Sequence, residues 1–312
     1  MIYGIPVTRF VRELYKEISE DDIFNGAAAL GFYLTLALFP AIIFVMAVIP
    51  YLPIANVDVA IMDLLRQVMP ASAADMVSGV VEEVTANQSG GLLSFGALAT
   101  IWAASSGMVA IIQQLNVTYD VGEGRNFVKV RALAIGLSVL FGLMVVAAFT
   151  LIVVGGIAQE WIGEHYGVST AVLMLFAALR WAIILGLLLL GFALIYYLAP
   201  DVKQDFRFIT PGALLGVLLL AIASLGFSLY VSRFADYSAT YGSIGAVIIL
   251  MLWLYIAGLV ILLGSEINAL VEHYAPHGKE KGEKREGEKP DAPAGRKAPP
   301  PPPPPRGAEG AR

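Results

Sequence analysis

Residues 244–270 read IGAVIILMLWLYIAGLVILLGSEINAL, and the first 22 of them contain no charged side chain. A helix needs about 20 mostly apolar residues to cross a bilayer. Five further stretches meet this requirement: 27–51, 92–114, 132–157, 170–199 and 209–231. The predicted fold class is therefore all-α, a polytopic membrane protein built as a bundle of six transmembrane helices.

Lys and Arg are unevenly distributed among the segments that flank these spans. Seventeen of the 20 lie in the N-terminal segment, the second and fourth loops and the C-terminal tail, while the alternate loops hold only Arg66 and Arg233. The remaining one, Arg180, lies within a span. Because short loops rich in Lys and Arg stay in the cytoplasm, both termini are predicted to be cytoplasmic.

The composition argues against several classes of function. A net charge of -5 would repel a nucleic acid, whereas small juxtamembrane clusters of basic residues suit anionic lipid headgroups. The chain has no cysteine, no GxxxxGK[ST] phosphate loop and no GxSxG motif. We therefore expect membrane lipids as partners, no nucleic acid, no cofactor and no metal site, and we identify no catalytic residues.

The regions outside the spans have distinct characters. Residues 1–26 are predicted to form a cytoplasmic interfacial helix, in which one set of residues is apolar (Phe10, Val11, Leu14, Ile18) and the opposite set is charged (Arg9, Arg12, Glu13, Glu17). Residues 75–84, in the first external loop, show a similar amphipathic pattern, either as a helix at the headgroups or as a lid over a cavity. Residues 27–274 form the predicted membrane domain.

The C-terminal segment, residues 275–312, alternates Lys, Glu and Gly and then contains seven consecutive prolines at 299–305. Such a composition cannot bury an apolar core, so disorder is expected. A polyproline II segment can bind an aromatic groove. The partner of this tail, if it has one, stays open, as does assembly into a homo-oligomer.

Small residues within the spans indicate where helices approach each other closely. Gly212 and Gly216 form a GxxxG step, and Ala27 and Gly31 repeat the same spacing in the first span. Pro40 interrupts the first span and is a candidate kink.

Ionisable residues at membrane depth often mark function. Arg180 is either near the midplane, where it would face an anion, or near the external interface. Glu266, late in the sixth span, is expected to pair with a basic loop residue such as Arg125, Lys129 or Arg131. Asn116 and Tyr119 form a weaker polar group at the end of the second span. We take Arg180, Glu266, Asn116 and Tyr119 as candidate binding residues.

Four motifs resemble the YihY/BrkB family of bacterial inner-membrane proteins: AALGFYLTLALFP (28–40), LNVTYDVGEGRNF (115–127), YYLAP (196–200) and YGSIGAVIILMLWLYIAGLVILLGSEINA (241–269). The resemblance covers about residues 10–274. It implies a six-helix protein of the bacterial inner membrane without an agreed activity. Members have been linked to serum resistance, to envelope lipid export and, under an old label, to ribonuclease activity.

The residues argue against the ribonuclease label. A metal-dependent nuclease needs His and carboxylates gathered around a metal, but the three histidines, His165, His273 and His277, are predicted to lie on different sides of the membrane. We predict a transporter or translocator of an anionic lipid or solute, because Pro40 interrupts a span and Arg180 and Glu266 are charges within spans. The alternative is a structural or scaffold membrane protein that binds envelope partners, and a lipid-modifying enzyme is a third, weaker interpretation.

Overall fold

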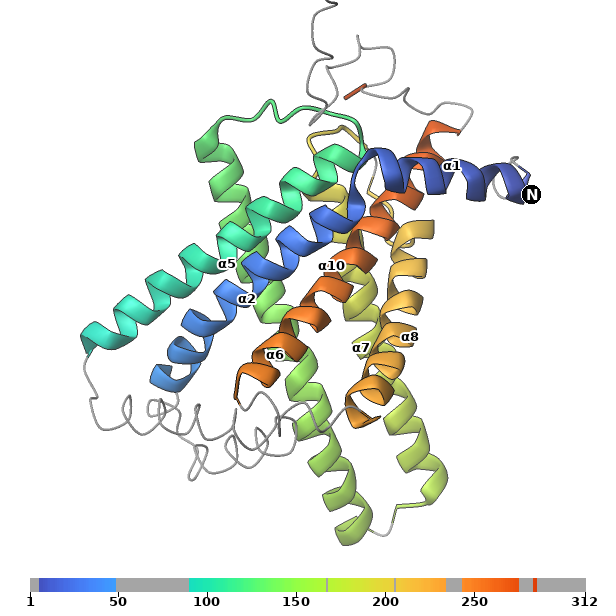
Figure 1. Cartoon of the computed structure of the whole chain (residues 1–312). Helices are drawn as coiled ribbons and strands as arrows, with labels where there is room; N and C mark the ends of the chain where they lie inside the picture. The colour runs from blue at the N-terminus through green and yellow to red at the C-terminus, as the bar shows by residue number, and fades with distance from the viewer. Residues whose placement is uncertain are drawn as a thin grey trace, which may run out of the picture.

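The structure is a computed structural model that describes residues 6–48, 90–166, 168–204, 206–233, 243–274 and 283–284. Within these residues the chain is helical and contains no strand. The helices are α1 (Val7–Glu20), α2 (Ile23–Val48), α5 (Gly90–Thr118), α6 (Phe127–Tyr166), α7 (Thr170–Leu198), α8 (Pro211–Arg233) and α10 (Ser243–His273). The predicted all-α class is thus confirmed (Figure 1).

Five of the described helices are long and apolar enough to cross a membrane: α5, α6, α7, α8 and α10. They coincide with five of the six predicted spans. Helix α2 covers the first predicted span, and its apolar stretch is described over Ile23–Leu38. The chain is therefore a membrane protein by the length and composition of its helices, while a count of six spans and the orientation of the termini stay predictions.

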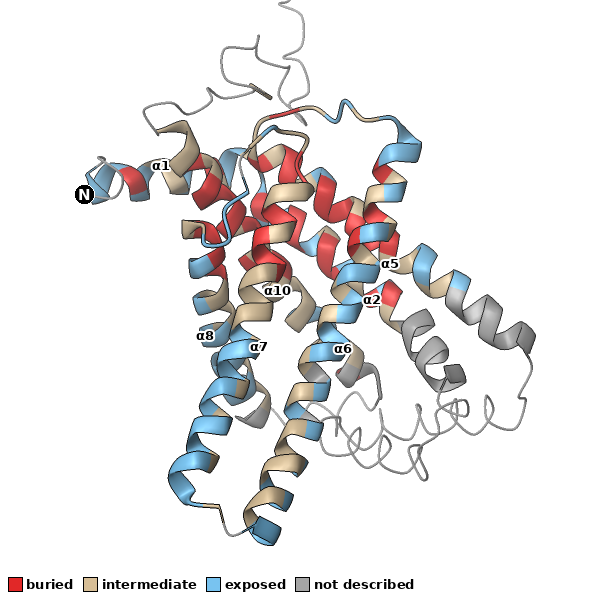
Figure 2. Ribbon diagram, turned by 180° about the vertical axis from the view of Figure 1, so that it is seen from behind, coloured by how far each residue is buried: buried red, intermediate tan, exposed pale blue. Residues whose placement is uncertain are grey.

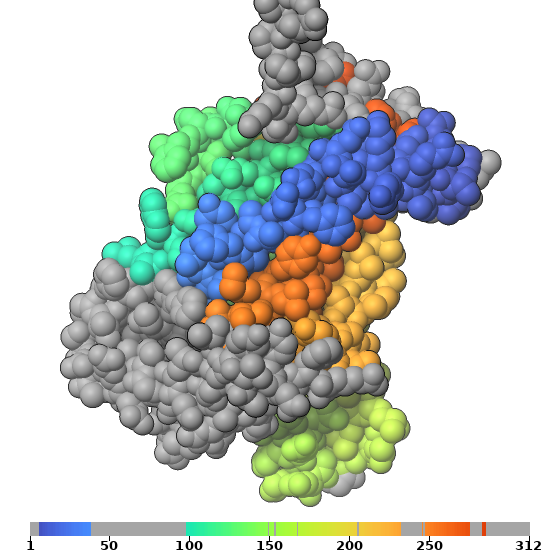
Figure 3. Space-filling model, in the orientation of Figure 1, coloured from blue at the N-terminus to red at the C-terminus, as the bar shows by residue number. Residues whose placement is uncertain are grey.

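Helix α10 lies at the centre of the bundle. It packs against α2 and α8, and α2 also packs extensively against α5. Helix α5 packs against α6, α6 packs against α7, and α7 packs against α8. In the space-filling view, α2 and α8 lie on either side of α10 (Figure 3). The stretch that decides the fold class in sequence is thus also the helix that links the two sides of the bundle.

The buried residues concentrate in the half of the bundle that carries α1 (Figure 2). The largest fully buried apolar side chains there include Leu30, Ile112, Leu115, Tyr196 and Leu262. The opposite half of α6, α7 and α8 exposes apolar side chains over long stretches. A helix exposed and apolar around most of its surface is stable in lipid rather than in water.

Helix α1 lies across the end of the bundle at which α10 ends (Figure 1). Phe10 packs against Ile267 and Leu270 of α10. The predicted faces of this helix are partly wrong, because Glu17 is buried at 8% exposure while Val11 is 57% exposed. The error arises because contact with α10, rather than apolar periodicity alone, selects the buried face.

Three of the predicted packing residues lie where helix backbones approach closely. A Cβ atom added at Gly212 would overlap the backbone oxygen of Gly264 in α10. A Cβ at Gly31 would lie 3.1 Å from the backbone nitrogen of Tyr255, and one at Gly216 would lie 2.9 Å from the Phe192 ring. The fourth, Ala27, is completely buried. These helices are close enough that a larger side chain has no space.

Other predictions fall partly or wholly outside the described residues. Helix α2 continues over Pro40 as far as Val48, so this proline does not end the helix. The amphipathic segment 75–84 lies outside the described residues. So does the tail from residue 275 onward, apart from residues 283–284.

Candidate functional site

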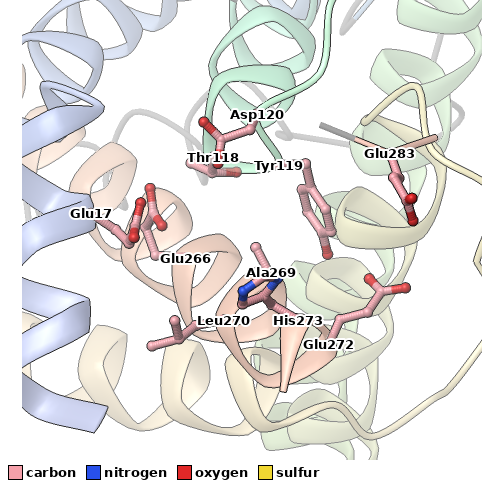
Figure 4. A pocket seen from close by; sticks show the side chains of 10 residues that line it. All are labelled: Glu17, Thr118, Tyr119, Asp120, Glu266, Ala269, Leu270, Glu272, His273 and Glu283. Atoms are coloured by element: carbon pink, nitrogen blue, oxygen red, sulfur yellow. The ribbon is translucent and has the colours of Figure 1, made fainter. Parts of the chain in front are cut away.

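A small acidic pocket lies between α1, the end of α5 and the end of α10 (Figure 4). Its volume is about 40 Å³. The lining residues that carry polar groups are Glu17, Thr118, Tyr119, Asp120, Glu266, Glu272, His273 and Glu283. Two of the four candidate binding residues, Glu266 and Tyr119, therefore meet in one pocket.

The turn after α5 places Asp120 at this pocket. Asp120 has a φ of 54°, in the left-handed region, and the N–H of the following Val121 donates to the carbonyl of Asn116 at 3.0 Å. This bond closes the last turn of the helix in a Schellman arrangement, whose left-handed position usually holds glycine or asparagine. Aspartate tolerates that conformation better than most residues, and here it adds a carboxylate.

Glu266 is the most deeply buried acid of the pocket, with 2% of its surface exposed. The Asp21 carboxyl lies within hydrogen-bonding reach of it, and Glu17 and Asp120 also face it. Its Oε1 atom has no hydrogen-bond partner. No ion pair of Glu266 is found in the described part of the chain, so the expected pairing with a basic loop residue is wrong.

Two of the three basic residues proposed as partners, Arg125 and Arg131, are engaged elsewhere. Arg125 donates to Glu123 Oε2 at 2.7 Å and to the carbonyl of Ala199 at 2.8 Å. Arg131 stacks on Trp102, with 3.8 Å from its guanidinium carbon to the ring centroid, and donates to Ser106. Arg125 is thus held at the α5–α6 turn and at the end of α7, and Arg131 is held against the middle of α5.

Tyr119 borders the same pocket just beyond the apolar part of α5. Desolvation raises the pKa of its phenol well above the usual value, and the charges of Glu272 and Glu266 raise it further. The hydroxyl therefore stays neutral at physiological pH and can donate a hydrogen bond into the pocket.

Asn116, the third candidate binding residue, belongs to a hydrogen-bonded cluster next to the pocket. We call this cluster the polar staple, and it consists of Asn116, Glu123, Gly124 and Asp201. Its Oδ1 accepts from the Asp201 N–H at 2.7 Å, and its Nδ2 donates to Glu123 Oε2 at 3.0 Å. Gly124 N–H donates to Asp201 Oδ2 at 2.9 Å. The side chain of Asn116 thus uses its amide to join the α5–α6 turn to the α7–α8 turn, rather than to face the pocket.

The tail reaches the polar staple at residue 284. Lys284 Nζ lies 2.8 Å from Asp201 Oδ2, and the carbonyl of Lys284 accepts from the Lys203 N–H at 2.9 Å. Burial opposes ionisation of Asp201. The hydrogen bonds from Lys284 and Gly124, with the charges of Lys284 and Arg125, outweigh this effect and hold the pKa of Asp201 below its usual value.

This lowered pKa predicts a loss of stability in acid. A carboxyl whose pKa is lower in the folded state than in the unfolded state stabilises the protein at any pH above its pKa in the unfolded chain, which is about 3.9 for aspartate. This contribution is lost as the pH falls through the pKa of the folded state. We expect the thermal unfolding temperature of the protein to decrease when the pH is lowered below about 4. This decrease should be smaller in Asp201→Asn. Because the pair is partly exposed, screening should limit the difference to about 1 kcal/mol or less. Equal acid sensitivity of the two proteins would contradict this assignment.

Arg180, the fourth candidate, is remote from the pocket. It lies 18 residues before Leu198 in α7, which corresponds to about 27 Å at the rise of an α-helix. Its Nε and Nη1 atoms are buried without a hydrogen-bond partner among the described residues. Since the four candidate residues divide between two ends of the bundle, they cannot form a single site.

Two glycines of α6 make room for this side chain. A Cβ atom at Gly155 would lie 2.9 Å from Arg180 Cδ, and one at Gly156 would lie 3.3 Å from Arg180 Nη1. The Oε1 atom of Gln159, one turn further along α6, is also buried without a partner. The side chain of Arg180 therefore packs against the backbone of α6 at Gly155 and Gly156, where no side chain intervenes.

Comparison with known proteins identifies the family. The family model described as Virulence factor BrkB matches residues 14–289. The chain belongs to the BrkB family. The resemblance noted in the motifs is thereby confirmed over most of the chain.

Relatives of this BrkB family chain carry two kinds of name. The putative ribonuclease-like protein YfkH of Bacillus subtilis is 40% identical over 262 residues, which cover 84% of this chain and 94% of YfkH. A UPF0761 membrane protein of Vibrio vulnificus is 26% identical over 277 residues, covering 86% of this chain and 84% of its own. Another, from Cronobacter sakazakii, is 27% identical over 273 residues. No solved structure matches the chain.

The UPF0761 relatives are named as membrane proteins without an activity, whereas YfkH is named as a putative ribonuclease-like protein. In the described residues, no three His, Asp or Glu side chains are placed to hold a metal ion. His165 lies near the end of α6 and His273 at the end of α10, at opposite ends of the bundle, while His277 lies outside the described residues. The two described histidines, His165 and His273, therefore do not share a site.

Proposed function

We propose that this BrkB family protein is a six-span protein of the bacterial inner membrane, with cytoplasmic termini, that binds and translocates an anionic lipid or solute. The observation that carries the proposal is the guanidinium of Arg180, whose buried Nε and Nη1 lack partners in the described chain. A buried charged donor without an acceptor is costly. An anion from outside the chain would remove that cost.

The chemistry of this position suits a phosphate or a carboxylate. A guanidinium presents donors in a planar fork that matches either group. At about 27 Å from the end of α7 that borders the termini, Arg180 is closer to the far surface of a hydrocarbon layer of about 30 Å than to its middle. This depth favours contact with a headgroup phosphate over a site at the midplane.

Replacement of Arg180 with alanine should remove bound anionic lipid. Loss of a charge-assisted hydrogen bond costs about 1.5–3 kcal/mol, which corresponds to an affinity lower by about 10- to 100-fold. We would measure lipids that co-purify with the gently extracted protein by mass spectrometry, normalised to bulk membrane lipid. The rate at which a labelled anionic lipid crosses vesicles containing the protein is the second measurement.

Arg233→Ala is the matched control, because Arg233 ends α8 and its loss removes the same charge from the same half of the bundle. We expect Arg233→Ala to retain the lipid and Arg180→Ala to lose it. Equal lipid content in wild type and Arg180→Ala would refute the lipid site.

The scaffold alternative predicts the reverse pattern. It is supported by the attachment of Lys284 to Asp201, which holds one point of the tail against the bundle. Under this alternative, truncation after Ala275 should abolish the cellular phenotype and Arg180→Ala should have no effect. The two variants therefore distinguish transport from scaffolding in one experiment.

A further inference from the structure

Helix α1 carries an exposed apolar stripe in addition to the face that packs on α10. Val7, Val11 and Tyr15 follow one another at intervals of four residues, and all three are exposed. Residues at this spacing lie on one side of a helix. The N-terminal part of α1 also extends beyond the bundle, as the two opposite views show (Figure 1 and Figure 2). We call these three residues the α1 stripe, and the bundle leaves it uncovered.

Basic residues occupy another side of α1. Arg9, Arg12 and Lys16 are exposed, and at about 3.6 residues per turn they lie across the helix from the α1 stripe. A helix with one apolar side and one side rich in Lys and Arg lies in the headgroup layer of a membrane, with its apolar side toward the acyl chains. The sequence predicted an interfacial position for α1 alone. In the structure, Phe10 and Leu14 pack on α10, so the α1 stripe is the side that remains for lipid.

Two further segments at the same end of the bundle combine exposed apolar and basic side chains. The exposed residues are Phe127, Val128 and Lys129 at the start of α6, and Phe206, Arg207, Phe208 and Ile209 between α7 and α8. The Lys129 N–H donates to Asn126 Oδ1 at 2.9 Å, which caps the first turn of α6. Phe206 packs edge-on against Tyr197 of α7, with 5.3 Å between the ring centroids. Both segments are therefore held at helix ends.

The two ends of the bundle differ in charge. Residues 157–169, around the α6–α7 turn at the opposite end, include two glutamates and neither Lys nor Arg. At the α1 end, several acids are withdrawn from the surface or neutralised. Glu266 is buried, and Glu123 and Asp201 are held in ion pairs with Arg125 and Lys284. The α1 end therefore presents exposed cations beside exposed apolar groups on three separate segments.

We propose that the α1 stripe, the start of α6 and residues 206–209 together bind the surface of a bilayer leaflet that is rich in anionic lipid. The apolar groups insert among the upper acyl chains, and Arg12, Lys129 and Arg207 attract the headgroup phosphates. The surface continues into the exposed apolar sides of α6, α7 and α8. Its charge selects anionic over neutral headgroups. It lies at the opposite end of the bundle from Arg180 and is distinct from the proposed translocation site.

Spin labels measure whether these segments enter the membrane. The chain has no cysteine, so Val11→Cys, Phe208→Cys and Arg9→Cys each provide a single attachment site in the full-length protein. All three positions are exposed, and positions 9 and 11 lie on different sides of α1. In vesicles of phosphatidylcholine and phosphatidylglycerol, labels at 11 and 208 should be more accessible to oxygen, which concentrates in the bilayer, than to a water-soluble nickel complex. The label at 9 should show the reverse preference.

The preference for anionic lipid is tested with a fluorescent probe at Val128→Cys, quenched by brominated phosphatidylglycerol or brominated phosphatidylcholine. We expect stronger quenching by the anionic lipid, and loss of this preference in about 1 M NaCl, where the Debye length is about 3 Å. Lys129→Gln should lower the preference by about 5-fold, because a basic residue near the surface contributes about 1 kcal/mol. Arg233→Gln is the control, since Arg233 ends α8 at the opposite end of the bundle, and it should leave the preference unchanged.

Two results would overturn the proposal. A label at 11 as accessible to nickel as the label at 9 would leave the α1 stripe to a protein partner. Equal quenching by the two lipids at low salt would show that the surface does not select anionic headgroups. The salt response needs no charge substitution, so a misfolded variant could not produce it. Because the Arg180 site is measured by lipid that co-purifies with the extracted protein, failure here would leave the proposed function unaffected.

Discussion

Replacement of Gly212 with alanine is expected to destabilise the bundle by about 3 kcal/mol or somewhat more, at the upper end of the cost of overpacking a core. The added Cβ would overlap the backbone oxygen of Gly264 and would lie 2.7 Å from the side chain of Asn268. Neither neighbour can move freely. The first is helix backbone, and Asn268 Oδ1 accepts a hydrogen bond from the Gly212 N–H at 2.8 Å.

The contact at Gly212 also caps a helix. Gly212 is the second residue of α8, and Asn268 of α10 satisfies one of the N–H groups that the first turn leaves free. Asn268 Nδ2 in turn donates to Thr210 Oγ1 at 3.1 Å. Separating α8 from α10 would therefore cost both packing and a cap. This combination is why we expect a larger effect here than at other glycines of the bundle.

Gly226→Ala is the control, because it lies on the same helix and an added Cβ would meet nothing within 4 Å. Alanine favours a helix over glycine by about 1 kcal/mol, so this variant should be neutral or slightly stabilised. Unfolding in detergent, followed by circular dichroism during titration with a denaturing detergent, measures both. A Gly212→Ala protein as stable as Gly226→Ala would show that α8 and α10 are not in backbone contact.

The second large effect is expected for Asn116→Ala, at about 3 kcal/mol. Asn116 is 2% exposed. The substitution removes the acceptor for the Asp201 N–H and a donor to the Glu123 carboxylate. Bonds to charged groups contribute about 1.5–3 kcal/mol, and each unpaired buried group adds a penalty.

Gln113→Ala serves as its control, since Gln113 lies on the same helix and is exposed. We expect that variant to unfold with the wild type, and Asn116→Ala to expose the turn at 119–126 to limited proteolysis at lower denaturant concentration. If Asn116→Ala retained its stability but lost a bound ligand, Asn116 would be a binding residue, as the sequence first indicated, instead of part of the staple.

The candidate site was only partly predictable from the sequence. Glu266 and Tyr119 were selected because charged and phenolic groups near the ends of apolar spans are conspicuous, and both line the pocket. Glu17 was assigned to the solvent-facing side of its helix, whereas the structure buries it. A signal was available in part, because Glu17 lies seven residues, about two turns, after the buried Phe10 on α1.

Asp120 and Asp21 gave no comparable signal. Both are short acidic residues in turns, where aspartate is common for its local hydrogen bonding. Their importance arises from facing Glu266, more than 140 residues away from either in the chain. Arg180 presents the opposite case. Its charge within an apolar span was evident from the sequence, but the glycine pair that receives it belongs to another helix.

The sequence by itself determined that this is a helical membrane protein of the BrkB family. Long runs without charge can satisfy their backbone hydrogen bonds in lipid only as helices or closed barrels, and runs of more than 20 residues are long enough for helices. Only the tertiary structure decided which polar groups share an environment. Helix contacts bring Glu17, Asp120 and Glu266 to one pocket and leave Arg180 at the other end of the bundle. The physical reason is that apolar length is a local property of the chain, whereas desolvation and the pairing of charges depend on neighbours from distant segments.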